Sequence, residues 1–508
     1  MQKKSDVGLF FLVLLLLSQV TILPILASGS DVKIETNQNV LTFTTGKQSW
    51  TQINEDGFGN RHNIAPRGIE IFQGSLVVGT ENFINPFIEL EFNTDYSIRQ
   101  FIYRVTFLSN WSRIDSDGCE IWCYTKEEGL KQIVGDNEEA IMPAGFGNKN
   151  NIEVGILIEY KDYLYAGLYN VREGCQVWRT KDLGGEWELV VRGGFGNTSN
   201  IAAWVAEVFN GDLYVGTINR KYGCQVFRTN DGTHWEAVVG DKSVTPSGFG
   251  DKGNIYAWSM CVYNSDFYIG TILGELWKSL DGVTWHPVIA YKNIIAAKLH
   301  GAYLPRGFKQ KILGSEYLGG IRRLIVYNDE LYAGMIGGDH LVDLTIFNLI
   351  TIKFSRGLNP FGRLRHLNHG AEIWKYNAID DKWTRVVGGR RKGHNDSGGF
   401  GDPKNHEMWS MVTDGEDIYV GTMYLEDIQA TLKRNHFQNW SVSLETLKGP
   451  AQLWIYDGKN WERLVGDGFG DDYNLGIRMM TIYENSLVAL TYNLKTGCEM
   501  WKCDLGST

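Results

Sequence analysis

One short phrase recurs six times in this chain of 508 residues, and its spacing limits the folds available. The copies are GFGNRHN (57–63), GFGNKNN (145–151), GFGNTSN (194–200), GFGDKGN (248–254), GFGDPKN (399–405) and GFGDDYN (468–474). Between copies, four short runs of β-type residues are separated by turn residues, which is typical of a four-stranded meander. Repetition at about 50 residues predicts the blades of a β-propeller rather than one continuous sheet.

The second strand of the meander sets the number of blades. Its seven copies are LVVGT (76–80), LYAGL (164–168), LYVGT (213–217), FYIGT (267–271), LYAGM (331–335), IYVGT (418–422) and LVALT (487–491). The last repeat lacks a fourth strand, but SWTQI (49–53) near the other end of the chain fits that place. We therefore predict an all-β, seven-bladed propeller of four-stranded antiparallel blades over residues 48–504. The N-terminal strand 49–53 closes the ring and removes exposed sheet edges.

Three turns between third and fourth strands read TKDLGGEW (180–187), TNDGTHW (229–235) and SLDGVTW (279–285). These turns resemble the Asp-box, the bacterial neuraminidase repeat of sialidases and other exported propellers. The GFG[ND] phrase also resembles one in exported bacterial and archaeal surface proteins. The resemblance implies a structural turn, in which Asp bonds its own backbone and Trp packs inward, so it indicates fold rather than activity. In the GFG phrase we expect Phe to wedge between blades and Asn or Asp to cap the turn.

Residues 1–30 have a basic start, a long apolar run and small residues at the end. This layout is typical of a signal peptide, with an uncleaved N-terminal anchor as the alternative. Residues 31–47 are expected to be a linker and residues 505–508 a tail. Acceptors for N-glycosylation at Asn110, Asn197, Asn395 and Asn439 fit a secreted or cell-surface, extracytoplasmic protein.

Charge and cysteine content narrow the function classes. The net charge of −10 disfavours nucleic-acid binding, and contact with a membrane is expected only through an uncleaved N-terminal segment. Seven cysteines leave at least one thiol outside any intrachain disulfide. No CxxC pair occurs. We expect small buried thiols rather than metal ligands.

Five long insertions fall on one face of the predicted propeller: residues 82–117, 292–320, 337–369, 389–404 and 425–449. Eight histidines map to that face: His62, His300, His340, His366, His369, His394, His406 and His436. Basic residues gather there between Lys353 and Lys392, which favours an anionic ligand, with solvated loop charge as the alternative. The segments HLNH (366–369) and GHND (393–396) have metal-ligand chemistry, but loop spacing is uninformative. No metal and no cofactor is predicted.

One column at the start of the inner strands departs from the apolar columns beside it. Its members are Arg67, Gly155, Trp204, Trp258, Arg322, Trp409 and Arg478. Arginine offers a planar fork for carboxylate, sulfate or phosphate, and tryptophan offers a flat face for a sugar ring. We expect the column to rim the central channel and clamp an acidic sugar. In the alternative, the arginines stack on the tryptophans and pair with Glu153 or Glu407.

The hypothesis is an exported propeller that recognises an anionic small molecule or acidic glycan. Sialidases hold a carboxylate with an arginine trio, so the resemblance also implies a glycoside hydrolase or polysaccharide lyase as an alternative. Catalytic residues stay unassigned, because Tyr169, Tyr424 and Tyr492 near the second-strand exits match no family motif. A third alternative is a surface adhesion or scaffold protein whose long loops contact a protein partner.

Overall fold

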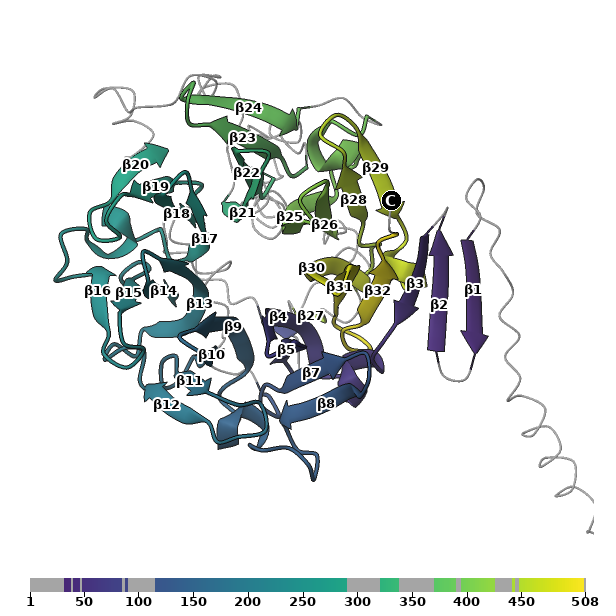
Figure 1. The fold of residues 1–508 in the computed structure, drawn as a ribbon, viewed down its shortest axis with the longest axis horizontal. Coiled ribbons are helices and arrows are strands. Elements are labelled where there is room, and N and C mark those ends of the chain that lie inside the picture. The colour runs from purple at the N-terminus through teal and green to yellow at the C-terminus, as the bar shows by residue number, and fades with distance from the viewer. Residues whose placement is uncertain are drawn as a thin grey trace, which may run out of the picture.

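The computed structural model describes residues 32–37, 40–45, 48–84, 87–89, 115–289, 320–337, 370–389, 394–424, 441–443 and 447–506. In these ranges, short antiparallel sheets stand side by side around a central axis, so the chain is an all-β propeller, as predicted (Figure 1). Within the same ranges, no helix combines the length and apolar character needed to cross a bilayer. The predicted leader, residues 1–30, lies outside the described residues.

Strand pairing traces seven four-stranded meanders within the described residues. The inner strands are β4 (Asn63–Phe72), β9 (Glu153–Tyr160), β13 (Asn200–Phe209), β17 (Ala257–Tyr263), β21 (Ile321–Tyr327), β25 (Asn405–Thr413) and β30 (Asn474–Tyr483). The second strands are β5 (Ser75–Asn82), β10 (Tyr163–Tyr169), β14 (Asp212–Asn219), β18 (Asp266–Thr271), β22 (Glu330–Met335), β26 (Ile418–Tyr424) and β31 (Ser486–Asn493). All seven predicted LYVGT-type segments are therefore strands.

The outer half of each meander completes the blades. The third strands are β7 (Ile121–Thr125), β11 (Val177–Thr180), β15 (Val226–Thr229), β19 (Leu276–Ser279), β23 (Ile373–Asn377), β28 (Leu453–Tyr456) and β32 (Met500–Asp504). The fourth strands are β8 (Gly129–Val134), β12 (Glu188–Val191), β16 (Glu236–Val239), β20 (His286–Ile289), β24 (Lys382–Val387), β29 (Trp461–Val465) and β3 (Gln48–Gln52). Blades are numbered 1 to 7 in the order of their inner strands.

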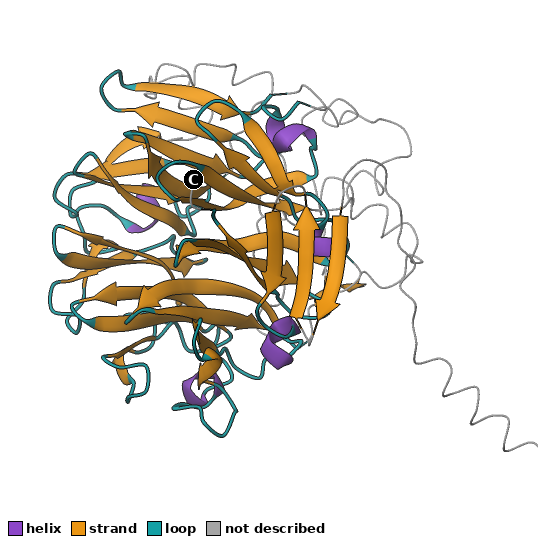
Figure 2. Ribbon diagram, turned by 45° about the vertical axis from the view of Figure 1, so that its right-hand side comes forward, coloured by secondary structure: helices purple, strands orange, loops and turns teal. Residues whose placement is uncertain are grey.

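The N-terminal strand β3 joins the last blade, as expected. It pairs antiparallel with β32, so that Trp50 lies opposite Cys503, and β3 and β32 stand side by side in one sheet (Figure 1). Residues 31–47 depart from the expected linker: β1 (Val32–Asn37) and β2 (Val40–Thr45) extend this sheet outward from β3. Their alternating sequences, VKIETN and VLTFTT, explain this, because alternation suits strand pairing. The side view shows the three strands at the edge of the ring (Figure 2).

The GFG phrase is the link between blades. Its Phe stacks on the third-strand aromatic residue of the blade it enters, with ring centroids 4.1–5.3 Å apart. The pairs are Phe58–Trp122, Phe146–Trp178, Phe195–Phe227, Phe249–Trp277, Phe400–Trp454 and Phe469–Trp501. Each Phe has φ between 56° and 61°, a strained value for a non-glycine residue. Each Phe also packs with apolar residues of the two adjoining blades, which confirms the wedge role.

The capping role of the Asn or Asp after GFG is confirmed as well. Its Oδ1 accepts the amide N–H two residues later in every copy, as in Asn197 to Ser199 at 3.1 Å. The final Asn of the phrase is fully buried and does more. Asn200 Nδ2 donates to the Gly194 carbonyl at 2.9 Å and to Gln225 Oε1 at 2.7 Å. Its Oδ1 accepts Asn219 Nδ2 at 2.8 Å, so it joins three strands of the blade.

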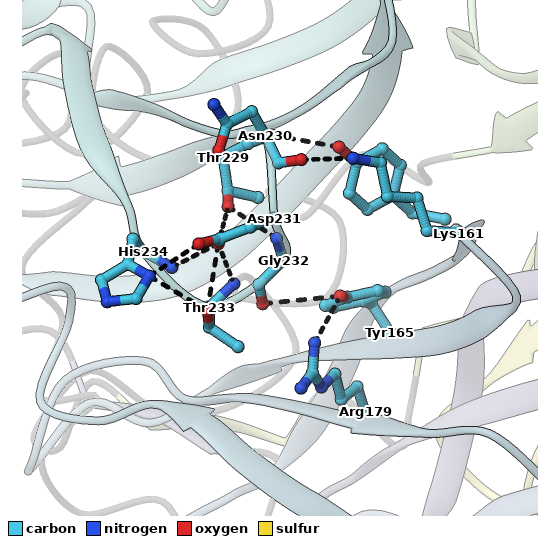
Figure 3. A network of polar contacts seen from close by, with 10 residues as sticks. Lys161, Tyr165, Arg179, Thr229, Asn230, Asp231, Gly232, Thr233 and His234 are labelled. Atoms are coloured by element: carbon cyan, nitrogen blue, oxygen red, sulfur yellow. Dashed lines mark hydrogen bonds and ion pairs between the residues drawn. The ribbon is translucent and has the colours of Figure 1, made fainter.

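The Asp-box-like turns have the structural role that the resemblance implies. Asp231 Oδ1 accepts the amide N–H groups of Thr233 and His234 at 2.7 and 2.8 Å. The turn also reaches the neighbouring blade, because Tyr165 of β10 donates its hydroxyl to the Gly232 carbonyl at 3.4 Å (Figure 3). Arg179 supports that tyrosine through a 3.2 Å bond to its oxygen.

All seven cysteines are buried and unpaired. Four of them share one position after a Gly, just before the third strand: Cys119, Cys175, Cys224 and Cys498. Burial raises the pKa of each of these four thiols. The expectation of small buried thiols is therefore confirmed.

Candidate functional site in the central channel

Each residue of the Arg/Trp column occupies a break in the register of its inner strand. In β13 the register with β14 shifts between Ala203 and Val205, which leaves Trp204 without a partner. The same shift surrounds Trp258, Arg322, Trp409, Arg478 and, over two residues, Arg67. A β-bulge re-aims the side chain of its extra residue. The bulges thus explain why one column converges instead of packing between blades.

The six side chains interleave across the channel, and we call them the Arg/Trp ring: Arg67, Trp204, Trp258, Arg322, Trp409 and Arg478. The Arg67 guanidinium carbon lies 3.5 Å from the Trp204 ring centre. Arg322 lies 4.7 Å from Trp258 and 5.8 Å from Trp409. Arg478 lies 4.6 Å from Trp409 and 5.9 Å from Trp204, so contacts cross between blades that are not neighbours.

Gly155 stands where the backbones of blades 2 and 3 approach each other closely. Arg67 of blade 1 reaches past blade 2 to Trp204 of blade 3, where its Nη2 donates to the Trp204 carbonyl at 2.6 Å. A Cβ on Gly155 would lie 2.4 Å from the Ala203 carbonyl oxygen, which no real Cβ tolerates. Blade 2 therefore contributes a glycine to the column where the other blades contribute Arg or Trp.

Buried carboxylates accompany the arginines. Arg67 Nε lies 3.5 Å from Glu153 Oε1, and Arg322 Nε lies 3.2 Å from Glu407 Oε2. Arg478 Nη2 lies between two carboxyl groups, 3.8 Å from Glu153 and 3.9 Å from Glu81. These contacts match the alternative expected from the sequence, in which the arginines stack on the tryptophans and pair with Glu153 or Glu407. The tryptophan faces are therefore covered by guanidinium groups rather than open to a sugar.

These ion pairs are incomplete as hydrogen bonds. The Nε atoms of Arg67, Arg322 and Arg478 are buried without a hydrogen-bond partner in the described structure, and so are both oxygens of Glu153. The ring indoles also lack acceptors, but Trp50 and Trp187 elsewhere share that feature. Each ring residue is at most 8% exposed, so a ligand must displace or join these contacts.

Burial controls the protonation of the carboxyl groups. It raises the pKa of Glu81 to about 8, with the charge of Glu153 adding to the effect and Arg478 opposing it. Burial also raises the pKa of Glu153 and Glu407, against the opposing charges of Arg67 and Arg322, respectively. Burial, together with the charge of Arg478, lowers the pKa of Arg67 and Arg322, but both keep their charge because a guanidinium holds its proton in proteins.

Three contributing residues escaped the sequence analysis. Glu81 stands at the end of β5, where other blades carry Tyr169, Ile218, Ile272, Ile336, Met423 or Tyr492. Arg323 donates from Nε to the Trp409 carbonyl at 3.1 Å, in a column that is otherwise uncharged. Tyr256 meets Trp204 edge to face at 5.3 Å. A lone charge in an uncharged repeat column is the signal that identifies Glu81 and Arg323.

Of the three tyrosines singled out in the sequence, two contact ring tryptophans and one does not. Tyr492 packs edge to face on Trp409 at 5.1 Å, and Tyr169 meets Trp204 at 6.2 Å. Tyr424 instead lies under the Lys404 ammonium at 5.4 Å. A cavity of about 390 Å³ lies on blade 6, lined by Asn395, Phe400, Gly401, Asp402, Gln452, Trp454 and Arg463.

Much of the predicted insertion face lies outside the described residues. The predicted acceptors and histidines outside the described residues are Asn110, Asn439, His300, His340, His366, His369 and His436, so the HLNH segment lies there as well. The basic residues outside the described residues are Lys353, Arg356, Arg363, Arg365, Arg390, Arg391 and Lys392. The insertions of blades 1 and 6 meet where β6 (Phe87–Glu89) pairs with β27 (Ser441–Ser443). His62 Nδ1 contacts Asp117 Oδ2 at 2.8 Å. Across the described ranges, no three His, Cys, Asp or Glu side chains are grouped to hold a metal.

Strand pairing and ring geometry define the class of protein, a β-propeller with a charged central channel. No protein-family model matches the chain, and no curated protein matches it significantly. The Asp-box family therefore stays a prediction.

Several solved propeller structures are similar in fold. They include a GH74 xyloglucanase from Xanthomonas campestris, at 12% identity and TM-score 0.45, covering 89% of this chain and 53% of that one. YCF48 from Cyanidioschyzon merolae has 9% identity and TM-score 0.45, covering 90% and 98%. The WD40 β-propeller domain of Doa1 has 8% identity and TM-score 0.42, covering 90% and 98%. The chain spans about half the length of the xyloglucanase. At these identities, the likeness concerns fold alone.

Proposed function

We propose that this chain is an exported or cell-surface β-propeller that binds an anionic ligand, an acidic glycan, at the Arg/Trp ring. One observation carries the proposal: three guanidinium groups from blades 1, 5 and 7 converge with their buried Nε donors unbonded. A buried donor without an acceptor costs about 1–3 kcal/mol. A ligand carboxylate or sulfate would accept charge-assisted hydrogen bonds from these donors.

The carboxylates of the protein itself do not accept hydrogen bonds from these three Nε donors. Glu153 lies 3.5 Å from Arg67 and 3.8 Å from Arg478, yet neither of its oxygens accepts a hydrogen bond from a described residue. A buried ion pair repays its desolvation only when geometry and hydrogen bonding are good. A ring that served only to hold blades together would gain little from such contacts, which favours a role in binding.

The tyrosines beside the ring supply the surface for the sugar. Tyr256 and Tyr492 are only half-buried and pack against the apolar cluster that includes Trp204 and Trp258. Tyr256 meets Trp204 edge to face and also packs on Trp258 at 5.3 Å, whereas Tyr492 meets Trp409 edge to face. An aromatic face suits the apolar side of a sugar ring. In this arrangement the tryptophans position the arginines, and the tyrosines contact the sugar.

Thermal denaturation of the full chain tests the proposal. Galacturonate, N-acetylneuraminate and a sulfated galactose are compared with neutral galactose. A ligand at a hundred times its dissociation constant stabilises by about 2.7 kcal/mol, an easily measured shift. We expect a shift with at least one acidic sugar and none with galactose.

A matched pair of variants assigns the binding to the ring. Arg322→Lys keeps the charge but loses the planar fork, so the shift should fall strongly. Arg179→Lys is the control, because Arg179 also rests on an aromatic ring, 4.5 Å from Tyr163, but lies away from the channel. Equal shifts with neutral and acidic sugars, or an unchanged shift in Arg322→Lys, would contradict the proposal.

A further inference from the structure

Two carboxyl groups share one guanidinium beside the Arg/Trp ring. Arg478 Nη2 lies 3.9 Å from Glu81 Oε2 and 3.8 Å from Glu153 Oε1. The two residues also lie opposite each other where β5 meets β9. Glu153 is 1% exposed and Glu81 12% exposed, so solvent screens their repulsion little.

An incoming anion would make this crowding worse. With both carboxyl groups ionised, the ligand would bring a third negative group to Arg478 and Arg67. Like charges held close together in a dry site cannot all ionise, and the usual solution is a shared proton. The raised pKa of Glu81, about 8, is consistent with this solution.

The surroundings of the pair contain both signs of charge. The titratable and charged groups that act on Glu81 or Glu153 are Arg67 on β4, Arg322 on β21, Arg478 on β30, Tyr169 on β10, Tyr492 on β31 and Cys119 before β7. Burial raises the pKa of both tyrosines and of the thiol, so these three stay neutral near neutral pH. Arg67 and Arg322 keep their charge, because a guanidinium holds its proton in proteins. Among these groups, the carboxyl pair is therefore the one that can take up a proton; Glu407, whose pKa burial also raises, lies against Arg322 instead.

We infer that the ring binds its anion together with one proton, held by the Glu81–Glu153 carboxyl pair. This inference rests on the proposed function. The ligand stays a carboxylate, the proton comes from solvent, and no covalent bond changes. The protonated pair can also donate one hydrogen bond to the ligand, which an ionised pair cannot.

Calorimetric titration of the full chain with galacturonate and with N-acetylneuraminate tests the inference. Titrations at pH 6 and pH 9, each in two buffers of different ionisation enthalpy, give the number of protons taken up. We expect none at pH 6, where the pair already holds its proton, and about one per ligand at pH 9. Above pH 8 the dissociation constant should rise about tenfold per pH unit.

Two variants test whether the pH dependence of binding comes from the Glu81–Glu153 pair rather than from another buried carboxyl group. Glu81→Gln should bind with an affinity that no longer changes between pH 6 and pH 9. Glu499→Gln is the matched control: burial raises the pKa of Glu499 to about 8 as well, but its partners are Trp501 and Asn474. This variant should keep the pH dependence of the original chain.

The outcomes distinguish the two claims. Binding at pH 9 without proton uptake, with an affinity independent of pH, would overturn the inference and leave the proposed function standing. Absence of binding by both sugar acids at both pH values would instead contradict the proposed function for uronate and sialate ligands. If Glu81→Gln fails to fold, the proton count of the unmodified chain still decides.

Discussion

Arg67 is held by three contacts of different kinds. Its guanidinium stacks on Trp204 at 3.5 Å, donates to the Trp204 carbonyl at 2.6 Å and lies 3.5 Å from Glu153. These contacts bring together blades 1, 2 and 3, so the residue has a structural role whether or not a ligand is bound.

Removing that side chain should therefore cost stability. We expect Arg67→Ala to destabilise the protein by about 3 kcal/mol, because it removes the contact with Trp204 and leaves the buried Glu153 with only the 3.8 Å contact to Arg478. The double variant Arg67→Ala/Glu153→Gln should recover much of this loss. Urea denaturation measures both, and a loss below about 1 kcal/mol for Arg67→Ala would show that the pair contributes little.

Glu499 is a second residue with a clear prediction. Its Oε2 accepts Trp501 Nε1 and Asn474 Nδ2, both at 2.7 Å. The equivalent residue in blades 2, 3 and 6 is Gln176, Gln225 or Gln452. A neutral acceptor thus suffices at this position, and burial raises the pKa of Glu499 from 4.5 to about 8.

The sign of the pH effect follows from this shift. Between pH 4.5 and 8 the folded chain holds a proton on Glu499 that the unfolded chain has lost, so the stability conferred by this group falls as pH rises. Glu499→Gln should raise the free energy of unfolding by about 1 kcal/mol or more at pH 8, and by less at pH 5. Denaturation at the two pH values measures this, and equal effects at both would contradict the shifted pKa.

At the scale of elements, the GFG phrase of residues 194–200 combines one half-buried and one fully buried asparagine. Asn200 makes hydrogen bonds to Gly194, Gln225 and Asn219, whereas Asn197 makes the capping bond to Ser199. We expect Asn200→Ala to cost about 3 kcal/mol, because it leaves several buried groups unpaired. Asn197→Ala should cost about 1 kcal/mol or less. Thermal denaturation compares them, and similar losses would contradict the assigned roles.

Repetition explains how much of the fold could be predicted from the sequence alone. Four-stranded meanders, the Phe wedge and ring closure by β3 repeat or complete a pattern, so the copies reinforce one another. The column of Arg67, Trp204 and their equivalents was also identified by counting residues. The bulges that turn this column into the channel could not be seen, because a register shift depends on the pairing of two strands.

The other differences between the sequence predictions and the structure come from features that occur only once in the chain. Glu81 interrupts an uncharged column in a single blade, and β1 and β2 lie outside the repeat altogether. Guanidinium groups from other blades lie over the ring tryptophans, so the proposal gives sugar stacking to the tyrosines instead. Such cross-ring contacts depend on the diameter of the closed channel, which no single repeat encodes.

On the scale of the whole molecule, closure of the ring depends on β3. Trp50 is fully buried and meets Phe469 edge to face at 5.3 Å, so a strand near the start of the chain completes a blade near its end. We expect deletion of residues 1–53 to abolish cooperative unfolding, because it opens the ring and exposes the edge of β32.

Deletion of residues 1–47 is the control for that experiment. It removes β1 and β2 but keeps β3, so unfolding should stay cooperative with a melting temperature within a few degrees of the full chain. Circular dichroism during heating compares the two. A cooperative transition after deletion of residues 1–53 would contradict the closing role of β3.

The most direct test of the account is a crystal structure of the full chain with an acidic sugar bound. We expect the ligand carboxylate or sulfate within about 3.2 Å of guanidinium nitrogens from at least two of Arg67, Arg322 and Arg478. We also expect the sugar ring to lie against Tyr256 or Tyr492. Density for the sugar in the blade 6 cavity near Trp454 and Arg463, with the Arg/Trp ring unchanged, would contradict the central claim.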